Sequence, residues 1–382
     1  MPALKPSLDL LRSMTDELAV RALAAELRLT RAELATRTGL SKPTVAESVR
    51  RLEAAGLVAD TGERTTGRGG VGSYYALAPD AGCALVVEIA PPGIVAETVD
   101  AYGEVRSRAE QAVPRPATRA GVTRALTQAA RRALRGNPAP ARVAVVSAAD
   151  PVDRTSGDLV HLPDEPFLVG SLSPAVALGS LVGGPVLVDN DVNWAARAER
   201  AAHPDGSMDN FAYLYLGEGV GCATVSDGEV VRGHAGIAGE VAHITTVGPD
   251  GRAIPFTEVF AELGLRHPGS TAIDVEALVA AVARDSVLRD QLSRAVVGVM
   301  GAIVALSDPS CIVLGGPWAT SEPLVEAIRS EQGRHPRAVP LAPAAERSGS
   351  SLGGARARAL SELHTALVMV AVHNAPSDSV TT

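Results

Sequence analysis

The stretch GLSKPTVAESVRRLEAAGLV, residues 39–58, decides the fold of the first part of this chain. Gly39 suits a left-handed turn that ends one helix, and the hydroxyl of Ser41 suits the N-cap of the next helix. Val45 and Val49 then recur at helical spacing and form an inward apolar stripe. A capped helix that follows a tight turn in this way predicts the recognition helix of a helix-turn-helix.

The other side of this helix is polar, as a surface that contacts DNA must be. Short hydroxyls and long cations can reach base edges and phosphates. The residues expected to make such contacts are Ser41, Lys42, Thr44, Ser48 and Arg51. Glu47 lies among them, and it either accepts a hydrogen bond from a cytosine or is a solvated neighbour.

Further elements are expected on both sides of the recognition helix. Two more short helices are predicted upstream within residues 16–58, and Thr30 is the expected cap of the second one. Downstream, Leu57–Val58 and the apolar residues 74–77 predict the strands of a two-stranded hairpin.

The hairpin loop, TGERTTGRGGVG at residues 61–72, carries Arg64 and Arg68, which complete the expected DNA contacts. Glycine lets a backbone approach a narrow minor groove, and arginine supplies the charge. We therefore predict that residues 1–78 form a winged helix-turn-helix DNA-binding domain. The alternative is a three-helix protein-docking module with a flexible loop.

Charge is segregated along the chain. The 382 residues carry a net charge of −8 with a pI of about 5.6, which argues against general binding of nucleic acid or anionic membranes. Residues 28–77, in contrast, hold eight basic and five acidic side chains, a net charge of +3. Contact with DNA is therefore expected at this segment.

The three cysteines and the lack of targeting signals predict a cytoplasmic protein with no membrane partner. Cys83, Cys222 and Cys311 match no disulfide framework and no CxxC metal pair, which indicates buried thiols in a reducing compartment. No apolar run approaches the length needed to span a bilayer, and the N-terminus lacks the plan of a signal peptide.

Residues 79–82 form the expected linker, after which strands alternate with helices. Residues 83–200 are predicted to form one lobe, and a similar order recurs over residues 201–375 as a second lobe, whose closing helices are free to return to the first. Two such halves predict an α/β body with a cleft between them. Residues 376–382 are expected to be a disordered tail.

Four separated blocks resemble motifs of the ROK family, which is named for repressors, open reading frames and kinases, in the family's order. They are VDNDVNWAARAER (188–200), YLYLGEGVGCATVSDGEVVRGHAGIAGEVAHI (213–244), DPSCIVLGG (308–316) and SLGGARARAL (351–360). The resemblance covers nearly the whole chain. It implies an actin-like ATPase, sugar-kinase-like body of two lobes behind the winged helix-turn-helix domain.

Both phosphate-binding loops of the family kinases are altered here. The DxGxT loop, whose backbone N–H groups hold ATP, corresponds to EIAPPG at residues 88–93, where Pro91 and Pro92 remove two donors. In the second loop Glu218 replaces the family's threonine, and a carboxylate repels a triphosphate. ATP binding and phosphoryl transfer are therefore not expected, and the chain is predicted not to be an enzyme.

The resemblance implies a sugar site at Asn190, Asp191, Glu240 and His243, with Asp191 in the position of the kinase base. Carboxylates and an amide suit a polyol, because they accept from hydroxyls and the amide also donates. For each residue alone a structural role competes, since Asn190 and Asp191 can cap a helix expected near residue 194 and His243 can be a satisfied core histidine. The four together predict a retained polar pocket.

The family commonly carries a cysteine-rich zinc loop after this histidine. Residues 244–262 contain no cysteine, so the tetrahedral site is not expected, and no other cofactor is predicted. Glu258 corresponds to the terminal glutamate of that loop, which also binds sugar, and it completes the candidate ligand site.

Together these features predict a sequence-specific transcriptional regulator such as a repressor. It is expected to bind a palindromic operator in double-stranded DNA as a homodimer or tetramer, under control of a sugar-type effector in the cleft. Two alternatives stay open: an orphan regulator whose pocket is a relic, and a sugar kinase with a fused DNA-binding head.

Overall fold

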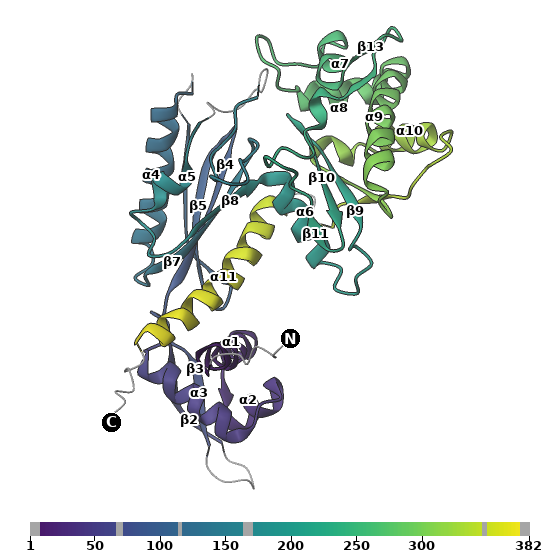
Figure 1. Ribbon diagram of the computed structural model, residues 1–382. Coiled ribbons are helices and arrows are strands. Elements are labelled where there is room, and N and C mark those ends of the chain that lie inside the picture. The colour runs from purple at the N-terminus through teal and green to yellow at the C-terminus, as the bar shows by residue number, and fades with distance from the viewer. Residues whose placement is uncertain (1–7, 66–71, 114–116, 163–170, 346–349, 375–382) are drawn as a thin grey trace, which may run out of the picture.

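The computed structural model describes residues 8–65, 72–113, 117–162, 171–345 and 350–374. A small head lies at one end of a first α/β lobe, and a second lobe lies beside the other end of the first (Figure 1). Arg68 and the tail 376–382, for which a DNA contact and disorder were predicted, lie outside the described residues.

The head confirms the predicted three helices and hairpin. Its elements are α1 (Leu8–Glu26), β1 (Leu29–Thr30), α2 (Arg31–Thr38), α3 (Lys42–Ala54), β2 (Val58–Arg64) and β3 (Ser73–Leu77). The short strand β1 adds to the hairpin, so the sheet has the order β1-β3-β2 and is antiparallel. Helix α1 begins at Leu8 rather than near residue 16, because Leu8–Asp16 continue the same helix.

Both predicted helix caps are present. Thr30 Oγ1 accepts from Glu33 N at 3.2 Å, and the Glu33 carboxylate accepts from Thr30 N at 2.8 Å, which completes a capping box. Ser41 Oγ accepts from Thr44 N at 3.3 Å. Gly39 ends α2 at a φ of 72°, in the region where glycine avoids the strain of a side chain.

The first lobe is a mixed sheet with helices on both faces. Its strands are β4 (Cys83–Ala90), β5 (Gly93–Asp100), β6 (Val105–Gln111), β7 (Ala141–Ala148) and β8 (Val186–Asn190), in the order β6-β5-β4-β7-β8. Its helices are α4 (Arg119–Arg135), α5 (Pro174–Leu178) and the C-terminal α11 (Ser350–Asn374). Strand β4 alternates between the two faces, with Leu85 packing in the core of α4 and Val86 in the core of α11.

The second lobe has its own sheet and a group of helices. The sheet has the order β11-β10-β9-β14-β15. Its strands are β9 (Phe211–Leu216), β10 (Val220–Ser226), β11 (Glu229–Val230), β14 (Ile312–Gly315) and β15 (Leu341–Pro343). The longer helices are α7 (Phe256–Glu262), α8 (Val275–Arg284), α9 (Ser286–Ser307) and α10 (Glu322–Gln332). Two short helices, η1 (Val241–His243) and η2 (Pro317–Thr320), also belong to this lobe. A separate hairpin is formed by β12 (Thr245–Val247) and β13 (Ala253–Pro255). Helix α6 (Asp191–Ala201) contacts strands of both sheets.

Helix α11 returns from the second lobe to the first and reaches the head (Figure 1). It lies against α6, β7 and β4, and it also contacts α1 and α3. Leu363 and Leu367 of α11 belong to the same apolar cluster as Val20 and Leu23 of α1. Head and first lobe therefore share one core and are not joined by a linker alone.

Helix α9 corrects the expectation that no segment approaches membrane-spanning length. Within the described chain it is the one helix whose length and composition would suffice to cross a bilayer. Half of its most apolar window is buried inside the protein. Leu292, Val296 and Val299 of this helix are fully buried in the core of the second lobe. A core helix of this kind satisfies the same length criterion, so the finding is weak evidence for a membrane.

Candidate functional site

The exposed surface of α3 holds three of the predicted DNA contacts. Ser41 and Lys42 are exposed at its N-terminus, and Thr44 is half-buried beside them. The hydroxyls of Ser41 and Thr44 lie 2.7 Å apart, so the two side chains share one hydrogen bond. Arg50, one turn beyond the capping turn, is exposed as well and was missed by the sequence analysis. The sequence does indicate that Arg50 is exposed, because it lies on the side of the helix away from the Val45 and Val49 stripe.

The prediction that Ser48 and Arg51 face outward was wrong. Ser48 is fully buried, and its hydroxyl donates to Asp16 Oδ1 of α1 at 2.5 Å. The Arg51 side chain is 18% exposed and forms an ion pair with the same carboxylate at 2.6 Å. Both side chains therefore join α3 to α1, because Asp16 is a buried acceptor that they satisfy together.

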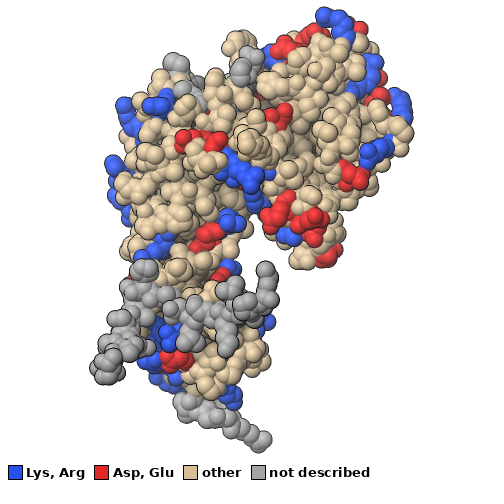
Figure 2. All heavy atoms as spheres, viewed as in Figure 1, with Lys and Arg blue, Asp and Glu red and all other residues tan. Residues whose placement is uncertain are grey.

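Most arginines on the head have carboxylate partners. The exposed ion pairs include Arg21–Glu17, Arg28–Glu63, Arg31–Glu53, Arg37–Glu26, Arg50–Glu47 and Arg64–Asp60. Figure 2 shows these mixed charges on the part of the head that the grey atoms leave visible. Exposed ion pairs contribute about 0–1 kcal/mol each, so a phosphate can replace the carboxylate at low cost. Glu47 pairs with Arg50, which favours the interpretation that Glu47 is a solvated neighbour and not an acceptor from a cytosine.

A cavity of about 640 Å³ lies between the lobes, within the size range of small-ligand sites. Four of the predicted sugar-binding residues line it, namely Asn190, Asp191, Glu240 and His243. Glu258 does not, because α7 turns Thr257 and Phe260 toward the cavity instead. The Glu258 carboxylate lies 3.1 Å from Arg266 Nη2 in an ion pair.

The Asn190 side chain is largely occupied by structure. It caps α6 by accepting from Val192 N at 2.9 Å, and its amide donates to the carbonyls of Asp150 at 3.2 Å and Ala148 at 3.4 Å. This is the capping role that the sequence analysis kept open, although the helix begins at Asp191 and not near residue 194. His243 is exposed on η1 and is therefore not a core histidine.

Asp191 is the first residue of α6 and lies at the wall of the cavity. One of its oxygens accepts from Val192 N at 2.7 Å. Burial and the nearby Glu88 charge together raise the pKa of Asp191 to about 7, against the opposing effect of the Val192 hydrogen bond. Near neutral pH this carboxyl can therefore both donate and accept hydrogen bonds.

The former phosphate loops line the same cavity. Pro91 and Pro92 make the two-residue turn between β4 and β5, where neither residue offers an N–H group. Glu218, in the turn between β9 and β10, is exposed and lines the cavity from the second lobe. Its backbone is held in place, since Glu218 O accepts from Ile273 N at 2.8 Å.

The segment that corresponds to the zinc loop is organised by packing. Thr246 of β12 is buried, and its hydroxyl donates to Ala295 O of α9 at 2.7 Å. Phe256 and Phe260 of α7 are fully buried, and Phe260 packs edge-on against Trp318 with ring centroids 5.9 Å apart. In the described part of the chain no group of three metal-ligating side chains comes together, so these residues do not fit the family's zinc ion.

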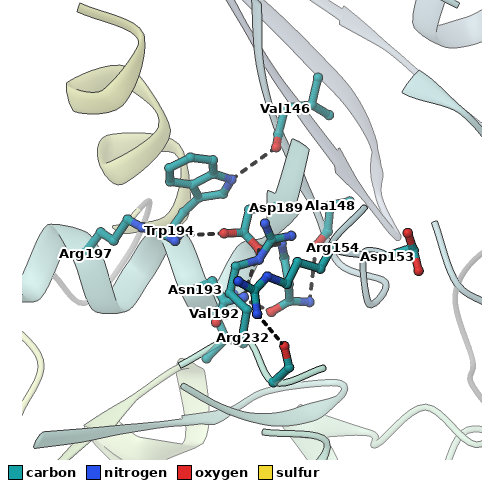
Figure 3. A network of polar contacts seen from close by, with 12 residues as sticks. Val146, Ala148, Asp153, Arg154, Asp189, Val192, Asn193, Trp194, Arg197 and Arg232 are labelled. Atoms are coloured by element: carbon teal, nitrogen blue, oxygen red, sulfur yellow. Dashed lines mark hydrogen bonds and ion pairs between the residues drawn. The ribbon is translucent and has the colours of Figure 1, made fainter. Parts of the chain in front are cut away.

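A polar network joins the lobes beside α6 (Figure 3). Asp189 is buried at the end of β8 and accepts from Asn193 Nδ2 and from Arg197 Nη1, both at 2.8 Å. Arg232, from the loop after β11, lies 3.3 Å from the same carboxylate. Arg154 of the first lobe donates to a backbone carbonyl of that loop at 3.0 Å. The sequence analysis missed Asp189, although Asn193 and Arg197 lie only four and eight residues further along the chain; only the approach of Arg232 depends on a distant segment.

Two protein-family models match successive parts of the chain. A model described as winged helix-turn-helix DNA-binding matches residues 15–59, and one described as ROK family matches residues 86–258. The first region runs from α1 into β2, and the second from β4 into α7.

Curated relatives of the body include sugar kinases. The bifunctional enzyme NanE/NanK of Brucella suis biovar 1 (strain 1330) is 28% identical over 165 residues, which cover 41% of this chain and 31% of that enzyme. The chain therefore spans about a third of the length of this relative.

Solved structures with the same fold include a regulator and a kinase. A ROK family transcriptional regulator, described as a homologue of the E. coli MLC protein, has a TM-score of 0.63 and 18% identity, covering 94% of this chain and 100% of that one. A ROK family glucokinase from Streptomyces griseus in complex with glucose and AMPPNP has a TM-score of 0.55 and 24% identity, covering 72% and 99%. These likenesses show the predicted fold, a winged helix-turn-helix domain followed by an actin-like, sugar-kinase-like body.

Proposed function

The chain carries a winged helix-turn-helix domain followed by a ROK family domain, and we propose from that premise that it is a DNA-binding transcriptional regulator controlled by a ligand in the interlobe cavity. It acts in the cytoplasm as a homodimer whose two heads bind a palindromic operator. The observation that carries the proposal is the combination of an exposed, cationic α3 N-terminus with a cavity in which one phosphate-loop segment carries two prolines and the other carries a glutamate.

A sugar kinase with a fused head is the second candidate, because Asp191 lies at the cavity in the position of the kinase base and curated relatives are kinases. Pro91 and Pro92 argue against it, since neither can donate a backbone hydrogen bond to a phosphate. Glu218 adds a negative charge where a triphosphate would lie. The proposed regulator needs neither a zinc ion nor another cofactor for its role, whereas a kinase would need Mg²⁺ with its ATP.

Helix α11 offers a physical route from ligand to head. Ser351 in its first turn lines the cavity and donates to Glu88 at 2.8 Å. Ala371, about 30 Å along the helix at 1.5 Å per residue, lies in the cluster shared with α1. A ligand that moves the first turn of α11 therefore also moves the surface on which the head packs, which couples the two sites.

Footprinting of DNA upstream of the chain's own gene tests the proposal. Protection of a two-fold symmetric sequence at physiological salt supports it, and binding without any sequence preference contradicts it. A parallel assay of ATP consumption with a panel of sugars separates the candidates. Sugar-dependent turnover would favour the kinase, because a regulator with disabled phosphate loops consumes no ATP.

A further inference from the structure

We propose that the interlobe cavity selects a ligand that combines a protonated amine with several hydroxyl groups, as in a hexosamine with a free amino group. This inference rests on the proposed function, in which the cavity is the effector site, and it specifies the chemical class of the effector. A neutral sugar and a phosphorylated sugar are the alternatives that it excludes.

The charge of the cavity wall is the first observation. Four carboxylates line it, from Glu88, Asp191, Glu218 and Glu240, and none of its described lining residues is a lysine or arginine. Such a wall repels a phosphate and attracts a cation. Two of the four, Glu88 and Glu218, come from the segments that correspond to the phosphate loops. Glu88 stands where the DxGxT loop also has a carboxylate, so it is Glu218, in place of a threonine, that makes the cavity more negative.

Several carboxylate oxygens remain able to accept hydrogen bonds. Glu88 accepts from Ser351 through one oxygen, and Asp191 accepts from Val192 N through one oxygen. Within the described residues, the other oxygen of Glu88 and both oxygens of Glu218 accept no hydrogen bond from a side chain or from another residue's backbone. An ammonium group has three donors and no acceptor, which matches this surplus of acceptors.

Some of the cavity carboxylates are close enough to affect one another, and this indicates the part of the wall where an amine would bind. Tyr215 lies on the cavity wall, and burial together with the charges of Asp191, Glu218 and Glu88 raises the pKa of its phenol. The Glu88 charge also contributes to the raised pKa of Asp191. An ammonium bound in this part of the cavity lowers the mutual repulsion of Glu88 and Asp191, which line the same wall.

The rest of the wall suits the carbon ring and hydroxyls of such a ligand. Glu240, His243 and Thr257 supply acceptors and donors on the second lobe. Phe260 and Ile273 supply apolar surface against which a ring can pack. The cavity of about 640 Å³ is also large enough for a monosaccharide.

Calorimetric titration of the full chain without DNA tests the inference with D-glucosamine, D-glucose, N-acetyl-D-glucosamine and glucose 6-phosphate at pH 7. We expect glucosamine to bind about tenfold or more tightly than glucose, the effect of one modest charge interaction, and glucose 6-phosphate most weakly. Glu218→Gln should reduce the glucosamine preference, because it removes one of the negative charges of the cavity wall. Glu218 is exposed, so its substitution should leave the fold intact. Glu229→Gln, an exposed carboxylate on β11 away from the cavity, is the matched control.

Equal binding of glucosamine and glucose overturns the inference, and so does preferred binding of the phosphate or no binding at all. Retention of the full amine preference in Glu218→Gln overturns the assignment of the amine to this wall. Because no DNA is present, a failure of operator binding would count against the proposed function and would leave these results unaffected.

Discussion

Arg51 of α3 and Asp16 of α1 form a nearly buried ion pair in which both carboxylate oxygens accept from the guanidinium, at 2.6 and 3.1 Å. Ser48 donates to one of the same oxygens. The recognition helix is therefore held on α1 by a shared acceptor whose side chain is only 2% exposed. Its orientation depends on this contact as well as on the apolar stripe of α3.

Arg51→Ala should destabilise the head by roughly 3 kcal/mol, because removal of one partner leaves the buried Asp16 carboxylate under-compensated. Arg50→Ala is the control, since Arg50 is exposed and pairs with Glu47 on its own helix. The Arg50→Ala substitution should lower the stability of the head by less than about 1 kcal/mol. Hydrogen exchange of α1 and α3 amides in the full chain measures both effects. Equal protection in the two variants would contradict the role assigned to Arg51.

Lys42→Ala and Arg50→Ala should each weaken operator binding without unfolding the head. Both side chains lie on the exposed surface of α3, so each loses one contact to phosphate or base. Where the contact is to phosphate, the slope of log K against log salt should fall by about one. Fluorescence anisotropy over a salt series gives affinity and slope together. Arg329→Ala, on the exposed side of α10, is the control and should change neither.

The caps of the head could be predicted from sequence because their bonds are local. Thr30 and Ser41 each accept from a backbone N–H three residues ahead. The placement of Ser48 was wrong although a signal existed, since it follows Val45 by three residues and so lies on the buried stripe. The placement of Arg51 had no such signal, because its partner Asp16 is 35 residues away in the sequence.

Part of the cavity lining could also be predicted from a local stretch of sequence. Asn190 and Asp191 lie in the block at residues 188–200 that resembles a family motif, so the sequence marked both of them at what is the junction of β8 and α6. Glu258 was placed wrongly, because only the register of α7 decides that Thr257 and Phe260 face the cavity. That Glu88 and Glu218 line one cavity depends on how the two lobes pack, which no local pattern records.

The free energy of unfolding should depend on pH through Asp191. The pKa of Asp191 is about 7 in the folded chain and 3.8 for an ordinary aspartate, so between these values the folded state keeps the proton that the unfolded state loses. Stability therefore falls as pH rises from about 4 to 7 and levels off above that range. Asp191→Asn removes this loss and should be more stable than the wild type at pH 8, by at least about 1 kcal/mol. At pH 4, urea unfolding should show nearly no difference in stability between Asp191→Asn and the wild type. An equal difference at pH 4 and pH 8 would contradict the raised pKa of Asp191.

Two glycine-to-alanine changes in helices should have opposite effects on stability. A Cβ at Gly354 of α11 would lie 2.0 Å from the Trp194 carbonyl oxygen of α6, so α11 packs on α6 only because this position has no side chain. Gly354→Ala should therefore cost about 1–3 kcal/mol or more. Gly301 of α9 is exposed, and a Cβ there would meet nothing within 4 Å.

Gly301→Ala should stabilise the chain by about 0.5–1 kcal/mol, because alanine loses less backbone entropy in a helix than glycine does. Urea unfolding of both variants at one pH measures the two effects. Because α11 also packs on the head, Gly354→Ala should lower the protection of α1 amides as well, whereas Gly301→Ala should leave it unchanged. Loss of stability without any change in α1 would show that α11 does not couple the cavity to the head.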